Sequence, residues 1–353
     1  MNNININKGK KIYDSHLNIK DTILDIDKKF KDLKLLYNSI DNIYYRYIKK
    51  PQNITKYGYV TIIFCDSKYL SSILVTGFYL KYILKTKYNI ICLVQDKSYY
   101  EKDIKGRNYL KFNGLRQDEI DDISKIYDVV IGINILNINI TKRSNFNLGN
   151  SYKTLPYYCT KLLCLGLSEY LKLIYYDAST LIIKNIDFLF NKYNISTHRK
   201  NYTITNINRG LIGNFYLFIP DRYYIYKGIF LTKNYDNIFQ NMPLYFTKDE
   251  DIIFYTVYPN WNKITFDLNL FKLNNYRYPY INKKYEENHF IECYIMTKPF
   301  IYPLNKTITE RTDYINNNSC YYYWDMSVQK MLKKFPELYI YFEFIKTFRE
   351  VNF

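Results

Sequence analysis

The 353-residue chain has few cysteines and no long hydrophobic run, and each shortage argues against a class of protein. Its six cysteines form no C-x-x-C pair and show no zinc-finger spacing, which argues against a structural zinc site and a disulfide framework. No stretch approaches the roughly 20 apolar residues of a membrane span. The N-terminus also lacks the apolar core of a signal peptide. We therefore expect a cytoplasmic protein without a transmembrane segment.

Tyrosine, isoleucine, asparagine and lysine are abundant instead, with 43 tyrosines and a net charge of +17. These residues have codons rich in A and T, so an AT-rich genome explains much of the bias. A strongly basic chain can bind nucleic acid, but here no basic run exceeds a few residues. We expect a nucleic-acid role to be unlikely and most tyrosines to lie in the core.

A hydrophobic content of 48% is ample for a buried core. Residues 1–20 are polar, and Asp21–Tyr47 carries an apolar stripe at helical spacing that ends before Pro51. The prediction is a helical extension over residues 1–56.

Strand-like and helix-like segments alternate after residue 56. Three strands are predicted at Tyr59–Phe64, Ile90–Val94 and Asp128–Gly132, with helices at Lys68–Leu84 and Asp118–Ser124. A strand–helix–strand order requires a crossover and makes neighbouring strands parallel. The sequence therefore predicts an open, doubly wound α/β sheet.

The most informative segment is Thr160–Phe190. Thr160–Lys172 has a near-helical apolar stripe, Leu173–Tyr176 fits a buried strand, and the acidic turn Asp177-Ala178-Ser179 follows at once. Open α/β sheets bind ligands beyond the carboxyl ends of their strands. An acid at this position is well placed to hold a metal and a phosphate.

This segment resembles glycosyltransferase family eight, the glycogenin-like family. There a T-K-L helix leads to an apolar strand, a D-x-D turn and an N-I-D-x-L-F stretch. The counterparts are Thr160-Lys161-Leu162, Asp177-Ala178-Ser179 and Asn185–Phe190, with Ser179 in place of the second aspartate. The resemblance implies a GT-A fold, with a single mixed sheet flanked by helices and with helical N- and C-terminal extensions.

The earlier strands resemble the same family, whose first strand is followed by a loop acid, a tyrosine and a helix with a glycine. Tyr59–Ile62, Asp66, Tyr69 and Gly77 stand in those places. The resemblance implies that this region binds uracil and ribose. The implied donor-nucleotide residues are Thr61, Asp66, Tyr69, Lys161, Asp177, Ala178 and Lys298.

Weaker resemblances supply the remaining positions. Asn208 matches an asparagine that faces the donor sugar, and Asp251 matches an aspartate near the sugar and the acceptor; these are the implied catalytic residues. The implied ligands of a Mn²⁺ or Mg²⁺ ion are Asp177, Ser179 and His289. The family's usual spacing, counted back from Lys298, reaches Glu292, so His289 and Glu292 remain alternatives for the third ligand.

The resemblance implies a retaining hexosyltransferase that takes a UDP-sugar and passes the sugar to an unidentified acceptor. The predicted domains are an extension at 1–56, a GT-A domain at 57–302, and a loop and helix at 303–353. Ser179 and Ile252 replace an acid and a glutamine of the family pattern. They motivate an alternative, a catalytically degenerate GT-A protein that binds nucleotide sugars or a partner.

Overall fold

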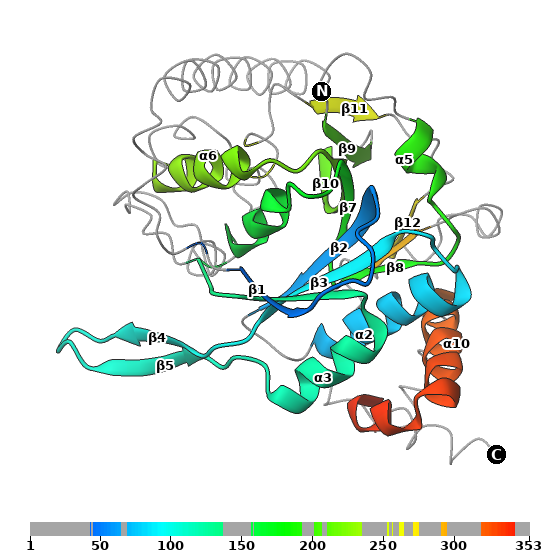
Figure 1. The fold of residues 1–353 in the computed structure, drawn as a ribbon, viewed down its shortest axis with the longest axis horizontal. Coiled ribbons are helices and arrows are strands. Elements are labelled where there is room, and N and C mark those ends of the chain that lie inside the picture. Colours follow the sequence, from blue (N-terminus) through cyan, green and yellow to red (C-terminus); the bar gives the residue numbers. More distant parts are fainter. Residues whose placement is uncertain are drawn as a thin grey trace, which may run out of the picture.

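The computed structural model describes residues 43, 45–64, 69–136, 157, 159–192, 201–206, 210–234, 253, 256, 261–264, 271–274, 291–294 and 319–342. They form a central mixed sheet with helices on both faces (Figure 1). The predicted mixed α/β architecture is therefore confirmed. Among these residues, no helix is both long enough and apolar enough to cross a membrane.

Four parallel strands form the middle of the sheet. They are β2 (Tyr57–Ile63), β3 (Asn89–Gln95), β6 (Val129–Ile133) and β7 (Lys172–Tyr176), in the spatial order β6-β3-β2-β7. Nearly all their residues are buried, as expected for parallel strands covered on both faces. The four predicted strands are thus confirmed, with boundaries shifted by one or two residues.

Further strands extend the sheet on both sides, to eight strands among the described residues. On one side β1 (Tyr45–Lys49) pairs with β6. On the other, β10 (Gly210–Phe218) pairs with β7, followed by β9 (Asn201–Asn206) and β11 (Trp261–Ile264). The predicted helix over Asp21–Tyr47 is wrong at its end, because Tyr45–Tyr47 lie in β1; the part before residue 43 lies outside the described residues.

Two smaller sheets accompany the central one. The first has the order β12-β13-β8 and contains β12 (Phe271–Asn274), β13 (Ile291–Tyr294) and β8 (Thr180–Ile182). The second is the hairpin of β4 (Tyr99–Lys102) and β5 (Asn108–Phe112), which projects away from the sheet (Figure 1). The first one matters for the site, because β8 begins directly after the acidic turn.

Helices α2, α3 and α10 cover one face of the sheet (Figure 1). Helix α2 (Leu70–Phe78) continues into the π-helix η3 (Tyr79–Ile83), while α3 (Gln117–Ile126) and α10 (Ser319–Lys334) pack beside it. The 3₁₀ helix η8 (Pro336–Phe342) follows α10. Trp324, Val328 and Met331 of α10 are fully buried in the same core. The predicted C-terminal helix therefore covers the core.

The opposite face carries α6 (Arg222–Lys233) and the 3₁₀ helix η4 (Cys159–Gly166). The short helix α5 (Phe188–Lys192) follows β8. The helix predicted over Thr160–Lys172 is thus shorter and tighter than expected. At its end, a Cβ atom on Gly166 would lie 2.3 Å from Cδ1 of Ile225. The end of η4 thus lies close against α6, where a larger residue would have to displace the Ile225 side chain, and the chain then turns toward β7.

Several tyrosines lie in the core. Tyr59, Tyr127, Tyr175 and Tyr176 are all fully buried. The hydroxyl of Tyr127 donates to the carbonyl of Ile73 at 2.8 Å and lies 3.0 Å from the hydroxyl of Tyr176. Buried hydroxyls need such partners, so these tyrosines join α2, α3 and β7 instead of offering surfaces for nucleic-acid bases.

The Asn185–Phe190 stretch has a structural role. Asp187 accepts hydrogen bonds from the hydroxyls of Tyr59 and Thr86, both at 2.7 Å, and its own backbone N–H donates to Asn185. This carboxylate therefore fixes the segment after β8 against β2 and against the chain that enters β3.

Candidate functional site

The acidic turn lies at the carboxyl edge of the parallel strands. Val60 of β2 is opposite Tyr175 of β7, so Asp177 follows β7 beside the end of β2. Asp177 and Ser179 then connect β7 to β8, which leaves the central sheet and pairs with β13. The sequence-based prediction that this acid lies beyond a strand end is confirmed.

Asp177 accepts hydrogen bonds on both carboxylate oxygens. Its Oδ2 lies 3.0 Å from Nζ of Lys161 and accepts from the hydroxyl of Tyr175 at 3.3 Å. Its Oδ1 accepts from the backbone N–H of Ser179 at 3.0 Å and from the Ser179 hydroxyl at 2.8 Å. The side chains of Lys161 and Asp177 are only 14% and 19% exposed, so this ion pair is largely removed from water.

Burial alone would raise the pKa of the Asp177 carboxyl. The charge of Lys161 and the hydrogen bonds from Ser179 outweigh burial, and they lower this pKa from 3.8 to about 2. The carboxylate is therefore ionised throughout the physiological pH range, and it holds the Lys161 ammonium next to the carboxyl end of β7.

The lowered pKa predicts acid sensitivity. Because the folded-state pKa of Asp177 is about 2 against an ordinary 3.8, its ionised form adds roughly 2 kcal/mol to the free energy of unfolding. This contribution is complete above about pH 4 and disappears as the pH falls through about 2. Unfolding by urea between about pH 5 and 2 should therefore show the advantage of wild type over Asp177→Asn shrinking by roughly this amount. If this advantage does not change with pH, the lowered pKa of Asp177 is contradicted. The control is Asp118→Asn, which changes an exposed carboxylate on α3.

The first turns of α2 hold the acidic turn in place. The hydroxyl of Ser72 donates to the carbonyl of Ala178, and the hydroxyl of Thr76 donates to the carbonyl of Thr180 at 3.0 Å. Tyr69 is the residue that precedes α2 and packs against the adjoining core. The predicted nucleotide residues Tyr69, Lys161, Asp177 and Ala178 thus belong to one connected region.

Thr61 lies within β2, away from the strand end. It is fully buried, and its hydroxyl has no hydrogen-bond partner among the described residues. Its neighbours Tyr59 and Ile63 at alternate positions belong to the core under α2. This position beneath the helix gives Thr61 a packing role in the fold described.

Several predicted site residues lie outside the described residues, namely Asp66, Asn208, Asp251, His289 and Lys298. Glu292 lies on β13, where it is paired with Leu181 of β8. The antiparallel register carries the carboxyl end of β13 toward the beginning of β8, next to Ser179. The backbone therefore places residue 292 two positions from the acidic turn.

The described donors do not by themselves form a divalent-metal site. An ionised carboxylate has about four lone-pair directions, and four hydrogen bonds reach the two oxygens of Asp177. The Ser179 hydroxyl donates its hydrogen bond to this carboxylate, so it could offer a metal ion only a neutral oxygen. Within the described part of the chain, no group of three His, Cys, Asp or Glu residues could hold a metal ion. A metal at Asp177 would have to displace one of its present partners.

Two residues of this region were not foreseen from the sequence. Tyr175 contacts Asp177 two positions along β7, and Ser72 binds the turn from α2. A tyrosine among 43 carries no signal of its own, and Ser72 is remote in sequence from the turn. The packing of α2 over the strand ends reveals Ser72, and the hydroxyl contact with Asp177 reveals Tyr175.

Comparisons with known proteins give limited overlap. No family model matches the chain. An uncharacterized protein of Acanthamoeba polyphaga mimivirus, R707, is 32% identical over 141 residues, which are 39% of this chain and 41% of that protein. The chain thus matches less than half the length of this curated relative.

Solved structures with a similar arrangement include several glycosyltransferases. The galactosyltransferase LgtC with donor and acceptor sugar analogs has a TM-score of 0.47 and 10% identity, over 77% of this chain and 95% of that chain. Apo GlyE of Streptococcus pneumoniae TIGR4 has a TM-score of 0.49 and 13% identity, over 81% and 64%. Mouse xyloside xylosyltransferase 1 has a TM-score of 0.41 and 8% identity, over 69% and 99%. These scores are too low to assign an activity.

Proposed function

We propose that the chain is a GT-A glycosyltransferase that moves a hexose from a UDP-sugar to an acceptor with retention of configuration. The observation that carries the proposal is the largely buried Lys161–Asp177 pair at the carboxyl edge of the sheet. Its two members are the residues that the T-K-L and D-x-D resemblance selects. Ligand sites of open α/β sheets lie at this edge.

Lys161 supplies the chemistry that the described residues can offer. Its ammonium is a compact point charge that can move from Asp177 to the oxygens of a diphosphate. A cation on these oxygens stabilises the negative charge that develops as the diphosphate leaves the sugar. Asp177 keeps the ammonium oriented until the donor binds. In the proposal Asn208 faces the donor sugar, Asp251 lies near the acceptor and Lys298 adds a second positive charge.

A Mn²⁺ or Mg²⁺ ion remains part of the proposal, but it needs a ligand besides Asp177 and Ser179. Such an ion would supply Lewis-acid chemistry at the diphosphate. Asp177 would be one ligand, Ser179 a weak one, and His289 or Glu292 the third. Because the hydrogen bonds of Asp177 are complete, we assign no step of the reaction to the ion.

One observation favours a second candidate, a degenerate donor site that binds a nucleotide sugar without turnover. Ser179 directs its hydroxyl to Asp177 and leaves one carboxylate where the family pattern has two. Release of free hexose from UDP-sugars separates the two candidates. The enzyme proposal expects a rate well above that of Lys161→Ala, and equal rates would support the degenerate site.

Replacement of Ser179 by aspartate should change the dependence on metal. Ser179 is 4% exposed, so a second carboxylate beside Asp177 would be buried next to a like charge. Without divalent ions the Tm of Ser179→Asp should fall below that of wild type. With millimolar Mn²⁺ it should rise again, because the two acids share the cation. Ser179→Asn is the neutral control. If Mn²⁺ does not change the Tm of Ser179→Asp, this turn does not bind the metal.

A further inference from the structure

A second charged feature lies at the far end of helix α2. A groove of about 470 Å³ is bounded by the end of α2, by η3 and by α10. Phe78, Tyr82 and Ile83 line it together with five lysines: Lys81, Lys85, Lys330, Lys333 and Lys334. The acidic turn contacts the beginning of α2 through Ser72, so the groove is at the opposite end of this helix.

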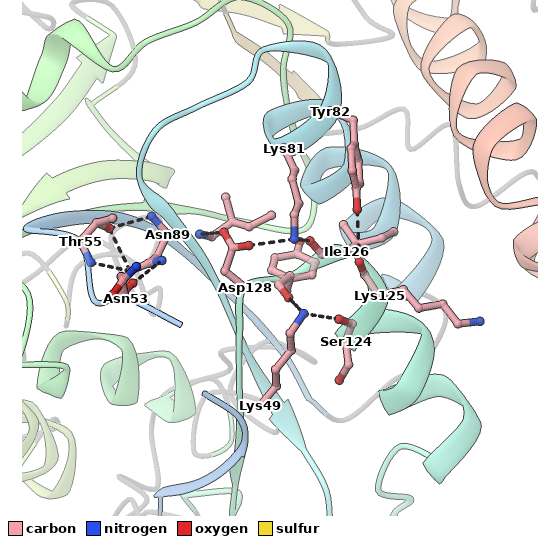
Figure 2. Close-up of polar contacts among 12 residues, drawn as sticks. Lys49, Asn53, Thr55, Lys81, Tyr82, Asn89, Ser124, Lys125, Ile126 and Asp128 are labelled. Carbon is pink, nitrogen blue, oxygen red and sulfur yellow. Dashed lines mark hydrogen bonds and ion pairs between the residues drawn. The ribbon is translucent and has the colours of Figure 1, made fainter. Parts of the chain in front are cut away.

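The walls of the groove contact neighbouring helices. The ring of Phe335, just after α10, packs against Phe78 and Tyr82, with centroids 6.2 Å and 5.6 Å apart. Figure 2 shows that Lys81 and Tyr82 reach the carboxyl end of α3: Lys81 donates to the Ile126 carbonyl at 2.9 Å, and Tyr82 donates to the Lys125 carbonyl at 3.4 Å. The groove walls are therefore tied to three helices.

Positive charge dominates the groove. Lys81 forms an ion pair with Asp128 at 2.8 Å (Figure 2). Within the described part of the chain, the other four lysines have no carboxylate partner at ion-pair distance. The Lys334 ammonium lies 3.9 Å from the centroid of the Tyr82 ring. Among the described residues, four lysine charges thus line the groove with no carboxylate at ion-pair distance.

The backbone at the groove is unusual in two ways. Residues Tyr79–Ile83 form a π-helix, a rare turn that is frequent at functional sites. Lys85 follows with a φ of 49°, and among the described residues it is the only non-glycine with a positive φ. The N–H of Thr86 closes this end by donating to the carbonyl of Leu80 at 3.1 Å. Glycine is the usual residue at such a helix end, so a lysine here is held at a conformational cost.

We propose that this groove binds a small anion that carries several phosphate groups. The volume falls in the range of small-molecule sites. Lysine ammoniums are compact point charges that bind phosphate oxygens, and several of them together favour an anion of high charge. Single-stranded nucleic acid needs open aromatic faces for base stacking. The Lys334 ammonium over Tyr82 disfavours such stacking.

Calorimetry with inorganic tripolyphosphate at fixed ionic strength tests this proposal. Wild type should bind saturably, and folded Lys161→Met should bind equally well, because the groove is separate from the Asp177 region. The variant Lys330→Ala/Lys334→Ala should bind at least about tenfold more weakly, since two charged hydrogen-bond donors are lost. Lys102→Ala/Lys105→Ala removes two exposed lysines of the β4–β5 hairpin, and it should leave the affinity unchanged.

A second variant separates binding from folding. Lys85→Gly should weaken tripolyphosphate binding and raise the Tm, because glycine accepts the positive φ. Three results would overturn the proposal: no saturable binding, an equal loss in the hairpin control, or loss of binding in folded Lys161→Met. Tighter binding of an oligothymidine that depends on the same lysines would also overturn it, in favour of a nucleic-acid site. None of these results depends on UDP-sugar turnover.

Discussion

Replacing Lys161 with methionine is expected to lower the free energy of unfolding by about 3 kcal/mol at neutral pH, because it leaves a largely buried carboxylate without its cation. Methionine keeps most of the apolar stem, so the loss reports the charge. The pKa of Asp177 should rise at the same time, since the largest influence that lowers it is the charge of Lys161. Urea unfolding at neutral pH measures the first effect, and its pH dependence measures the second.

The double variant Lys161→Met/Asp177→Asn is the decisive partner in this experiment. It removes both charges and should recover much of the stability that the single variant loses. Lys105→Met, on the exposed β4–β5 turn, is the matched control and should change stability by less than about 0.5 kcal/mol. If Lys161→Met resembles this control, the pair is a solvated contact and cannot orient a donor.

Gly77→Ala is expected to destabilise the fold by about 3 kcal/mol, although alanine is the better helix former by about 1 kcal/mol. A Cβ atom at residue 77 would lie 2.6 Å from Cε2 and Cζ of Tyr127. This ring is fully buried and anchored through its hydroxyl to Ile73 and Tyr176, so it cannot move aside cheaply. The overlap therefore outweighs the gain in helix propensity.

A double-mutant cycle with Tyr127→Leu tests this explanation. In the Tyr127→Leu background the ring is absent, and the cost of Gly77→Ala should fall to near zero or change sign. Thermal unfolding of the four proteins gives the coupling. The same cost in both backgrounds would show that the loss comes from elsewhere in α2.

Local patterns predicted much of the central fold. The β-rich runs that became β2, β3, β6 and β7 are short, apolar and bounded by polar residues, and the stripes of α2 and α3 follow helical spacing. Gly77 was singled out by family resemblance, and the structure gives the reason in the ring of Tyr127.

Features that depend on distant partners were not predictable in this way. Tyr45–Lys49 reads as the end of a helical stripe, but pairing with β6 makes it a strand. The 3₁₀ turn at Cys159–Gly166 packs closely against α6, and this contact is not visible in the local pattern. The site shows the same division: sequence and resemblance singled out Lys161 and Asp177, whereas only the fold reveals Tyr175 and Ser72.

Titration of UDP by calorimetry, with and without Mn²⁺, is the most direct test of the claim that Lys161 and Asp177 form a donor site. We expect micromolar binding by wild type and loss of this binding in Lys161→Met, with Lys105→Met unaffected. Dependence on Mn²⁺ would support the enzyme, and independence would support the degenerate site. No binding of UDP under either condition, in protein shown to be folded, would contradict the claim.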